Sequence, residues 1–101
     1  MFTGIVEETG IVERVEPTGS GIRLAIQSKV CARDLKLGDS LAVNGCCLTI
    51  VKISRTRTIR IIEFDLLKET WRRTNLQFAQ AGALVNLERS MCADGRFGGH
   101  F

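Results

Sequence analysis

Short runs of alternating apolar and polar residues constrain the fold of this chain more than any other feature of its sequence. Within residues 22–27, Ile22, Leu24 and Ile26 fall on one side of an extended chain and the residues between them on the other. Residues 83–89 repeat this period of two. Because successive side chains of a strand point to opposite faces, both runs predict half-buried β-strands.

The opening of the chain predicts a β-hairpin. Residues 2–8 and 11–16 have the composition of strands, and they flank Thr9 and Gly10, a pair typical of a tight connection. Three further elements follow in order: a helical turn over residues 30–35, a turn over residues 36–39 and a short strand over residues 40–44.

Residues 46–53 differ from the other strand segments because both alternating faces are largely apolar. One face carries Cys47, Thr49, Val51 and Ile53, and the other carries Cys46, Leu48 and Ile50. A small barrel needs to bury only its inner face. We therefore expect a ligand, a second domain or a partner subunit to cover the outer face of this strand.

The next segment predicts an irregular strand followed by a short helix. Over residues 58–64 the apolar positions change parity after Ile61, which a β-bulge would explain. Asp65 offers a carboxylate to cap a helix over residues 66–73. Six or so short strands with one or two short helices indicate an all-β fold, closed into an antiparallel barrel because closure removes exposed edges.

Composition fits one small domain. The 101 residues are 45% hydrophobic, which is enough for a single core. The net charge of +3 is too small to indicate a nucleic-acid partner. The one dense basic stretch, residues 54–60, is interpreted first as a solvated hairpin face, with phosphate binding as the alternative.

Signals for export, membranes and metals are absent from the sequence. The first eight residues lack a secretory pattern, and no run reaches the roughly 18 apolar residues of a membrane span, so we expect a cytoplasmic protein. The four cysteines are not spaced as zinc ligands. We expect no metal and no disulfide, with Cys31 and Cys92 as buried thiols.

Six sequence blocks resemble riboflavin synthases, in order and with matching spacing along the chain. They are Met1-Phe2-Thr3-Gly4-Ile5-Val6-Glu7-Glu8, Leu37-Gly38-Asp39-Ser40, Val43-Asn44-Gly45-Cys46-Cys47-Leu48-Thr49, Glu69-Thr70-Trp71-Arg72-Arg73-Thr74-Asn75-Leu76, Val85-Asn86-Leu87-Glu88-Arg89 and Gly98-Gly99-His100. At the position of Trp71 in this chain, the family more commonly has leucine. The resemblance implies a six-stranded Greek-key barrel, the first of two in a homotrimeric enzyme.

The resemblance also implies a reaction. The family transfers a four-carbon unit between two molecules of 6,7-dimethyl-8-ribityllumazine, forming riboflavin and a ribitylaminopyrimidinedione. It uses no metal and no organic cofactor, because the substrate's own acidic methyl group supplies the carbanion. The protein has to orient the two rings and handle protons.

By the same resemblance, twelve residues in three groups are expected to bind the substrate ring. They are Gly4, Ile5 and Val6; Cys47, Leu48 and Thr49; and Asp65, Leu66, Leu67, Lys68, Glu69 and Thr70. The backbone near Gly4 would pair with the pyrimidinedione edge. Thr49, Thr70 and Glu69 would bond ring or ribityl oxygens, and Ile5, Leu48 and Leu67 would contact the ring. Each of these polar residues also has an ordinary structural explanation.

No residue is predicted to be catalytic in this chain. The thiol of Cys47 could assist proton transfer or could simply be a packed side chain. His100 is more readily explained as a residue that caps the end of the chain than as a catalytic base. Riboflavin synthases continue into a second barrel, whereas this sequence ends at Phe101. We expect residues 1–97 to form the lumazine- or flavin-binding barrel and residues 98–101 to begin an interdomain segment.

Several functions remain open at this stage. The barrel alone is expected to bind riboflavin or lumazine, to pair as a homodimer, and to lack a complete active site. A homodimer that turns over the lumazine slowly is a second hypothesis. Non-catalytic lumazine or flavin antenna proteins are a third, and a nucleic-acid barrel is the least favoured, because aromatic residues are scarce and tyrosine is absent.

Overall fold

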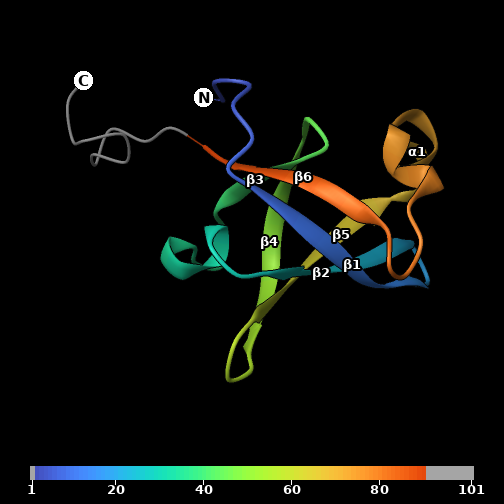
Figure 1. Cartoon of the computed structure of the whole chain (residues 1–101). Helices are drawn as coiled ribbons and strands as arrows, with labels where there is room; N and C mark the ends of the chain where they lie inside the picture. Colours follow the sequence, from blue (N-terminus) through green and yellow to red (C-terminus); the bar gives the residue numbers. More distant parts are fainter. Residues whose placement is uncertain (1, 91–101) are drawn as a thin grey trace.

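A computed structural model describes residues 2–90, apart from the side chain of Phe78, as a closed barrel of antiparallel strands (Figure 1). The strands follow the spatial order β1-β2-β5-β4-β3-β6. They are β1 (Glu8–Pro17), β2 (Gly21–Ser28), β3 (Ser40–Val43), β4 (Cys46–Arg55), β5 (Arg60–Leu67) and β6 (Leu84–Arg89). The predicted six-stranded all-β barrel is confirmed.

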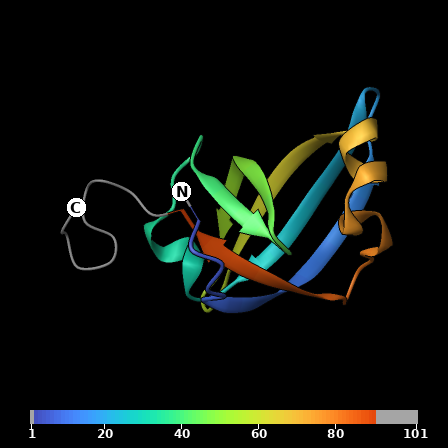
Figure 2. The ribbon, with the colours of Figure 1, turned by 90° about the horizontal axis from the view of Figure 1, so that it is seen from above.

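Three short helical segments complete the described chain. The 3₁₀ turn η1 (Cys31–Asp34) follows β2, as predicted, and α1 (Lys68–Arg73) and the 3₁₀ turn η2 (Asn75–Phe78) lie between β5 and β6. Seen from above, α1 lies beside β2 and β5 (Figure 2). Trp71 of α1 packs against the core, so this large side chain extends the apolar interior at that end of the barrel.

The core is formed by the inward-facing residues of all six strands together with residues of η1 and η2. Phe64 is the largest fully buried side chain. Leu24 and Ile26 of β2 and Val85 and Leu87 of β6 are buried as their period of two predicted. The turn at residues 36–39 is also confirmed, with the backbone N–H of Lys36 donating to the Asp39 carboxylate (2.9 Å).

The predicted opening hairpin is wrong. Residues 2–7 form no strand, and Thr9 and Gly10 lie inside the continuous strand β1. A Cβ on Gly10 would lie 2.7 Å from Cδ1 of Leu87 and 2.9 Å from the backbone oxygen of Gln27. Gly10 is therefore needed because neighbouring strands approach it closely, and it makes no turn.

The predicted bulge lies in a different strand. β5 pairs with β2 in unbroken register, whereas the register of β4 with β5 shifts between Ile50 and Lys52. The extra residue belongs to β4 and changes which residues face inward. Ile53 consequently packs against the core instead of sharing the outer face with Cys47 and Thr49.

The predicted capping role of Asp65 is also wrong. α1 begins at Lys68, its N-cap residue is Leu67, and no side chain caps it. Asp65 lies within β5 opposite Arg23 of β2, and the Arg23 guanidinium donates to both carboxylate oxygens. A cross-strand ion pair thus uses the carboxylate that local sequence assigned to the helix.

The basic stretch of residues 54–60 forms the hairpin between β4 and β5, as predicted. The backbone N–H of Thr56 donates to the oxygen of Ile59 (2.9 Å), which closes the turn. Among residues 2–90, no helix is long and apolar enough to cross a membrane. Cys92, His100 and the proposed boundary at residues 97–98 lie outside the described residues.

Candidate functional site

The N-terminal segment is fastened to β6 by the buried carboxylate of Glu88. Its Oε2 accepts from the backbone N–H of Thr3 (2.5 Å), the Thr3 hydroxyl (2.8 Å) and the backbone N–H of Gly4 (3.1 Å). Gly4 has a φ of +83°, a left-handed conformation that glycine adopts without steric cost. These bonds determine where the first predicted binding group lies.

A second fastening lies close by. The Arg89 guanidinium donates to Oε2 (2.6 Å) and Oε1 (3.0 Å) of Glu7 and also to Asp34 of η1 (2.6 Å). Hydrogen bonding to Glu7 and the two carboxylates raise the pKa of Arg89, outweighing its partial burial. The N-terminal segment, β6 and η1 are thereby held together by charge-assisted bonds.

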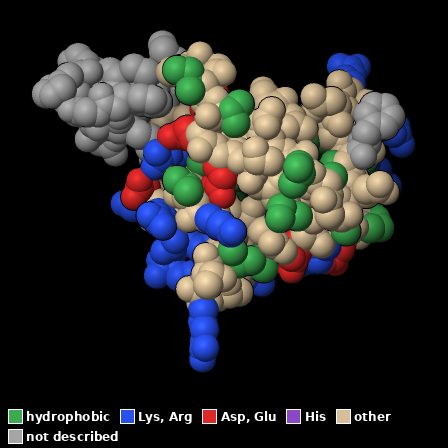
Figure 3. All heavy atoms as spheres, in the orientation of Figure 1, with side chains coloured by type: hydrophobic (Ala, Val, Ile, Leu, Met, Phe, Trp, Pro, Cys, Tyr) green, Lys and Arg blue, Asp and Glu red, His purple; other side chains and the backbone are tan. Residues whose placement is uncertain are grey.

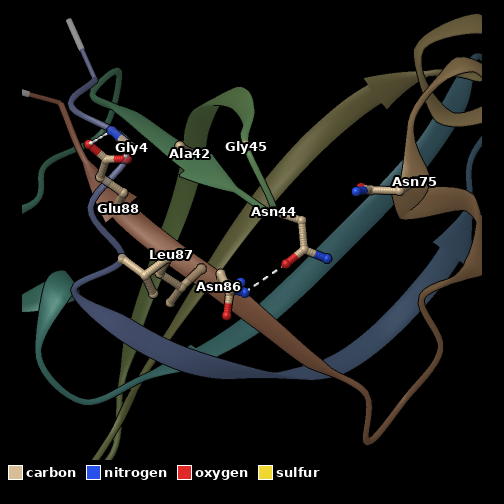
Figure 4. Close-up of a pocket in the computed structure, with 9 residues that line it drawn as sticks. Gly4, Ala42, Asn44, Gly45, Asn75, Asn86, Leu87 and Glu88 are labelled. Carbon is tan, nitrogen blue, oxygen red and sulfur yellow. Dashed lines mark hydrogen bonds between the residues drawn. The ribbon is translucent and has the colours of Figure 1, made fainter.

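A cavity of about 420 Å³ opens where this segment meets the β3–β4 turn and η2 (Figure 4). Its volume falls within the roughly 300–1,000 Å³ of small-molecule sites. The lining residues are Gly4, Val6, Ala42, Asn44, Gly45, Asn75, Asn86, Leu87 and Glu88. Two residues of the first predicted group, Gly4 and Val6, therefore line a cavity large enough for a ring.

Three asparagines give this cavity its polar character. Asn44 and Gly45 form the two-residue β3–β4 turn, both with positive φ (49° and 82°). Asn44 Oδ1 accepts from the backbone N–H of Asn86 (2.7 Å). In Figure 4 the Asn75 side chain points from η2 toward this turn. Side-chain amides carry both donors and acceptors, as a pyrimidinedione edge does.

The second predicted group lies on the strand next to the cavity. Ala42 of β3 pairs with Glu88 on one side and with Cys47 of β4 on the other. Directly opposed residues share a face, so the exposed Cys47 lies beside the cavity wall. Thr49 is exposed on the same face, whereas the Leu48 side chain is buried in the core and could offer a ligand only its backbone.

Among the residues that the structure describes, the first half of β4 has an edge without a pairing strand. The register of β4 with β5 ends at Ile50 and Phe64, and within the described chain residues 46–49 pair only with β3. The N–H and C=O of Ile50 bond to Asp39 and Gly38 on the β3 side. Because these groups alternate along a strand, those of Cys47 point toward the edge from which β5 has diverged.

The third predicted group lies on the far side of that edge, at the end of β5 and the start of α1. Leu67 is 67% exposed and Thr70 is half-buried. The Leu66 side chain belongs to the core, Asp65 is paired with Arg23, and Glu69 is paired with Arg73 (2.8 Å). Lys68 is exposed. Of this group, Leu67, Lys68 and Glu69 are exposed and Thr70 is partly exposed.

Among the cysteines of residues 2–90, burial shifts the pKa of Cys31 and Cys46. Burial and the nearby carboxylates of Glu7 and Glu8 raise the pKa of Cys31 to about 12. Burial beside Cys47 also raises the pKa of Cys46. The buried state predicted for Cys31 is confirmed, and both groups remain protonated thiols near neutral pH.

Some residues of the cavity were missed by sequence reasoning. The Asn44-Gly45 pair between two strands is a strong hairpin signal, and it would have located the turn that lines the cavity. Asn86 occupies an outward position of the alternating run that predicted β6. Nothing local distinguishes Asn75, because its position depends on how η2 folds back over the barrel.

Comparison with known families identifies this arrangement. A family model described as the lumazine binding domain matches residues 3–90, which include every strand of the barrel and every residue of the cavity. The chain belongs to the lumazine-binding domain family.

Relatives of this lumazine-binding domain include several riboflavin synthases. That of Bacillus amyloliquefaciens is 46% identical over 101 residues, which cover all of this chain and 45% of that protein. That of Bacillus subtilis is 45% identical with the same coverage, and that of Schizosaccharomyces pombe is 40% identical over 102 residues, with 47% of it covered. The resemblance predicted from the sequence blocks is confirmed. The chain spans about half the length of these curated relatives.

Proposed function

We propose that this chain is the amino-terminal, substrate-binding half of a riboflavin synthase, and that it binds the ring of 6,7-dimethyl-8-ribityllumazine or riboflavin. The observation that carries the proposal is the unpaired edge of β4 at Cys47 beside a cavity of about 420 Å³. A flat heterocycle placed there would meet backbone groups on one side and exposed apolar surface on the other.

Ring recognition would use the strand edge. The pyrimidinedione part of a lumazine presents alternating donors and acceptors along one edge, and a strand edge presents N–H and C=O groups in the same way. The backbone of Cys47 points to that edge, and the amides of Asn44 and Asn75 border the cavity next to it. Backbone recognition of this kind needs no charged side chain.

Side chains would then set orientation and affinity. Leu67, Ile5 and Val6 are exposed apolar residues that can contact the ring faces. The hydroxyls of Thr49 and Thr70 would bond ring or ribityl oxygens. The Glu69 carboxylate would accept from a ribityl hydroxyl, in exchange for its exposed pair with Arg73, which is worth little in water.

One barrel would supply only half of the reaction site. The proposed reaction needs two lumazine rings face to face, and the described barrel offers one strand edge with a cavity beside it. We therefore assign no catalytic residue to this chain, and no metal or organic cofactor enters the scheme. A second barrel, in another part of the enzyme or in a second copy of this chain, would hold the other ring.

Titration with riboflavin tests this function. We expect saturable quenching of riboflavin fluorescence by the chain. Thr49→Val should weaken binding about tenfold, because it removes one hydrogen bond to the ligand without changing volume. Thr58→Val, on the exposed β4–β5 hairpin, is the matched control and should leave the affinity unchanged.

The same titration can also contradict the proposed flavin site. If riboflavin fluorescence stays constant while circular dichroism reports a folded barrel, the chain has no flavin site. If Thr49→Val and Thr58→Val bind equally well, a flavin site exists but does not use the face of β4 that carries Thr49.

A further inference from the structure

Five cationic side chains surround a small hollow at the hairpin end of the barrel. Lys29 and Arg33 come from the η1 region, and Arg55, Arg57 and Arg60 come from the β4–β5 hairpin. The hollow has a volume of about 190 Å³, and the remaining lining residues are Thr56, Thr58 and Ile59. Figure 3 shows basic side chains gathered on the lower part of the molecule, with one projecting at its lowest point.

The register of the hairpin places like charges against each other. Arg55 of β4 and Arg60 of β5 are directly paired. Like charges in directly opposed positions destabilise a strand pair. The hairpin nevertheless keeps a defined turn, in which Thr56 bonds to Ile59 through both its backbone N–H (2.9 Å) and its hydroxyl (2.9 Å). The repulsion is therefore built into an ordered element.

Carboxylates do not neutralise this cluster. Within residues 2–90, none of its five cations forms an ion pair, whereas other basic residues do: Arg14, Arg23, Lys52, Arg73 and Arg89. Two acidic residues close to Lys29 and Arg33 along the chain or in space already have other partners. Asp34 binds Arg89, and Glu8 accepts from the backbone N–H groups of Lys29 (2.5 Å), Val30 (3.1 Å) and Cys31 (2.9 Å).

Size and charge together select the class of ligand. The hollow is smaller than the roughly 300–1,000 Å³ of sites that enclose a drug-sized molecule. Guanidinium groups match phosphate oxygens in geometry and charge, and several of them favour an anion with more than one negative charge. We propose that the hollow between η1 and the β4–β5 hairpin binds a small multivalent phosphate anion, of which pyrophosphate is the simplest.

This site does not depend on the proposed flavin site. None of its lining residues lines the cavity of about 420 Å³. The two lie at opposite ends of β4, which spans ten residues and hence about 30 Å. The sequence alone favoured a solvated hairpin face, and the convergence of Lys29 and Arg33 on the hairpin supports the phosphate alternative.

Calorimetric titration with pyrophosphate at about 0.15 M salt tests the proposal, since long-range attraction between exposed charges is largely screened there. We expect one saturable site. The double variant Arg33→Gln/Arg57→Gln should bind at least tenfold more weakly. A control variant, Lys36→Gln/Arg72→Gln, removes the same charge from exposed positions outside the hollow and should bind as the unchanged chain does. Thermal melting establishes that all three proteins are folded.

Three outcomes would overturn the proposal. One is the absence of binding heat with the folded, unchanged chain. Another is equal weakening in both double variants, which would reduce the effect to net charge. The third is that a short single-stranded DNA binds far more tightly than pyrophosphate at equal phosphate concentration, and does so through Arg33 and Arg57. That result would assign the surface to nucleic acid.

Discussion

At the scale of single residues, the buried carboxylate of Glu88 positions the N-terminal segment at the candidate site. Glu88 is only 6% exposed, yet it forms no ion pair within the described chain. Its negative charge is instead met by the N–H groups of Thr3 and Gly4 and by the Thr3 hydroxyl. A buried charge is tolerable only when it is hydrogen-bonded in this way. Glu88 therefore determines where the N-terminal wall of the cavity lies.

Replacing Glu88 with glutamine should weaken both the fold and the binding wall. The amide keeps one acceptor but loses the charge that strengthens the bonds to Thr3 and Gly4, so the free energy of unfolding should fall by about 2 kcal/mol. Riboflavin affinity should fall as well, because Gly4 lines the cavity. Urea unfolding and fluorescence titration measure the two effects.

Glu16→Gln is the control for this substitution. Glu16 is exposed and pairs with Arg14, so its loss should change the free energy of unfolding by less than about 0.5 kcal/mol. Equal stability of Glu88→Gln and the unchanged chain would refute the fastening role of Glu88.

At the scale of elements, the strands that local sequence predicts well are those whose environment alternates. β2 and β6 lie where alternating apolar and polar residues predicted strands, and β3 comes directly after the predicted turn at residues 36–39. The wrong predictions fall where contacts with a strand distant in sequence determine the local structure. Gly10 was interpreted as a turn because nothing nearby in sequence reports its contacts with Leu87 and Gln27. The bulge in β4 shows itself only in its register with β5.

The same reasoning explains how much of the site was predictable. Motif resemblance identified Gly4, Val6 and Cys47, which lie in or beside the cavity. It did not identify Asn75, whose place depends on the path of η2. It also included Leu48 and Leu66, because the resemblance does not separate inward from outward positions of a strand.

Gly10→Ala tests the close packing of β1. The added methyl group would overlap Leu87 and the backbone of Gln27, so the free energy of unfolding should fall by about 1–3 kcal/mol. Gly19→Ala is the matched control: a Cβ there meets no atom within 4 Å, so that protein should be as stable as the unchanged chain or slightly more so. Chemical denaturation of both variants measures their free energies of unfolding. Equal midpoints would mean that Gly10 is not packed as described.

The stability of the fold should vary with pH through the Glu8 carboxylate, which accepts backbone bonds at the start of η1. Burial opposes ionisation of Glu8, but backbone bonds from Lys29 and Cys31, the Ser28 hydroxyl and Val30 outweigh it and lower the pKa of the carboxyl below its ordinary 4.5. A carboxyl whose pKa is lower in the folded state stabilises the fold above its unfolded value. That stabilisation is lost as the pH falls through the lowered value.

Glu8→Gln isolates this contribution. The variant should be less stable than the unchanged chain near pH 7, and the difference should shrink as the pH falls below about 4.5. Denaturant unfolding of both proteins across this range measures it. A difference that stays constant with pH would show that the Glu8 charge does not stabilise η1.

At the scale of the whole molecule, the described strands form a closed barrel in which β4 pairs with β5 over only part of its length. β4 and β5 diverge beyond Ile50 and Phe64, and the turn that leads into β4 at this end lines the cavity together with η2 and β6. The chain spans about half of the riboflavin synthases that it matches. A second barrel facing this opening would cover exposed apolar residues of β4 and its surroundings, which include Val51 and Leu67.

Backbone amide NMR during a riboflavin titration is the most direct test of the proposed function. Binding at the β4 edge predicts that the largest shift changes occur in residues 4–6, 46–49 and 67–70. The β4–β5 hairpin, about 30 Å away at the other end of β4, should remain unchanged. Changes confined to the hairpin, or an unchanged spectrum at saturating riboflavin, would contradict the assignment of this barrel as the flavin-binding half of a riboflavin synthase.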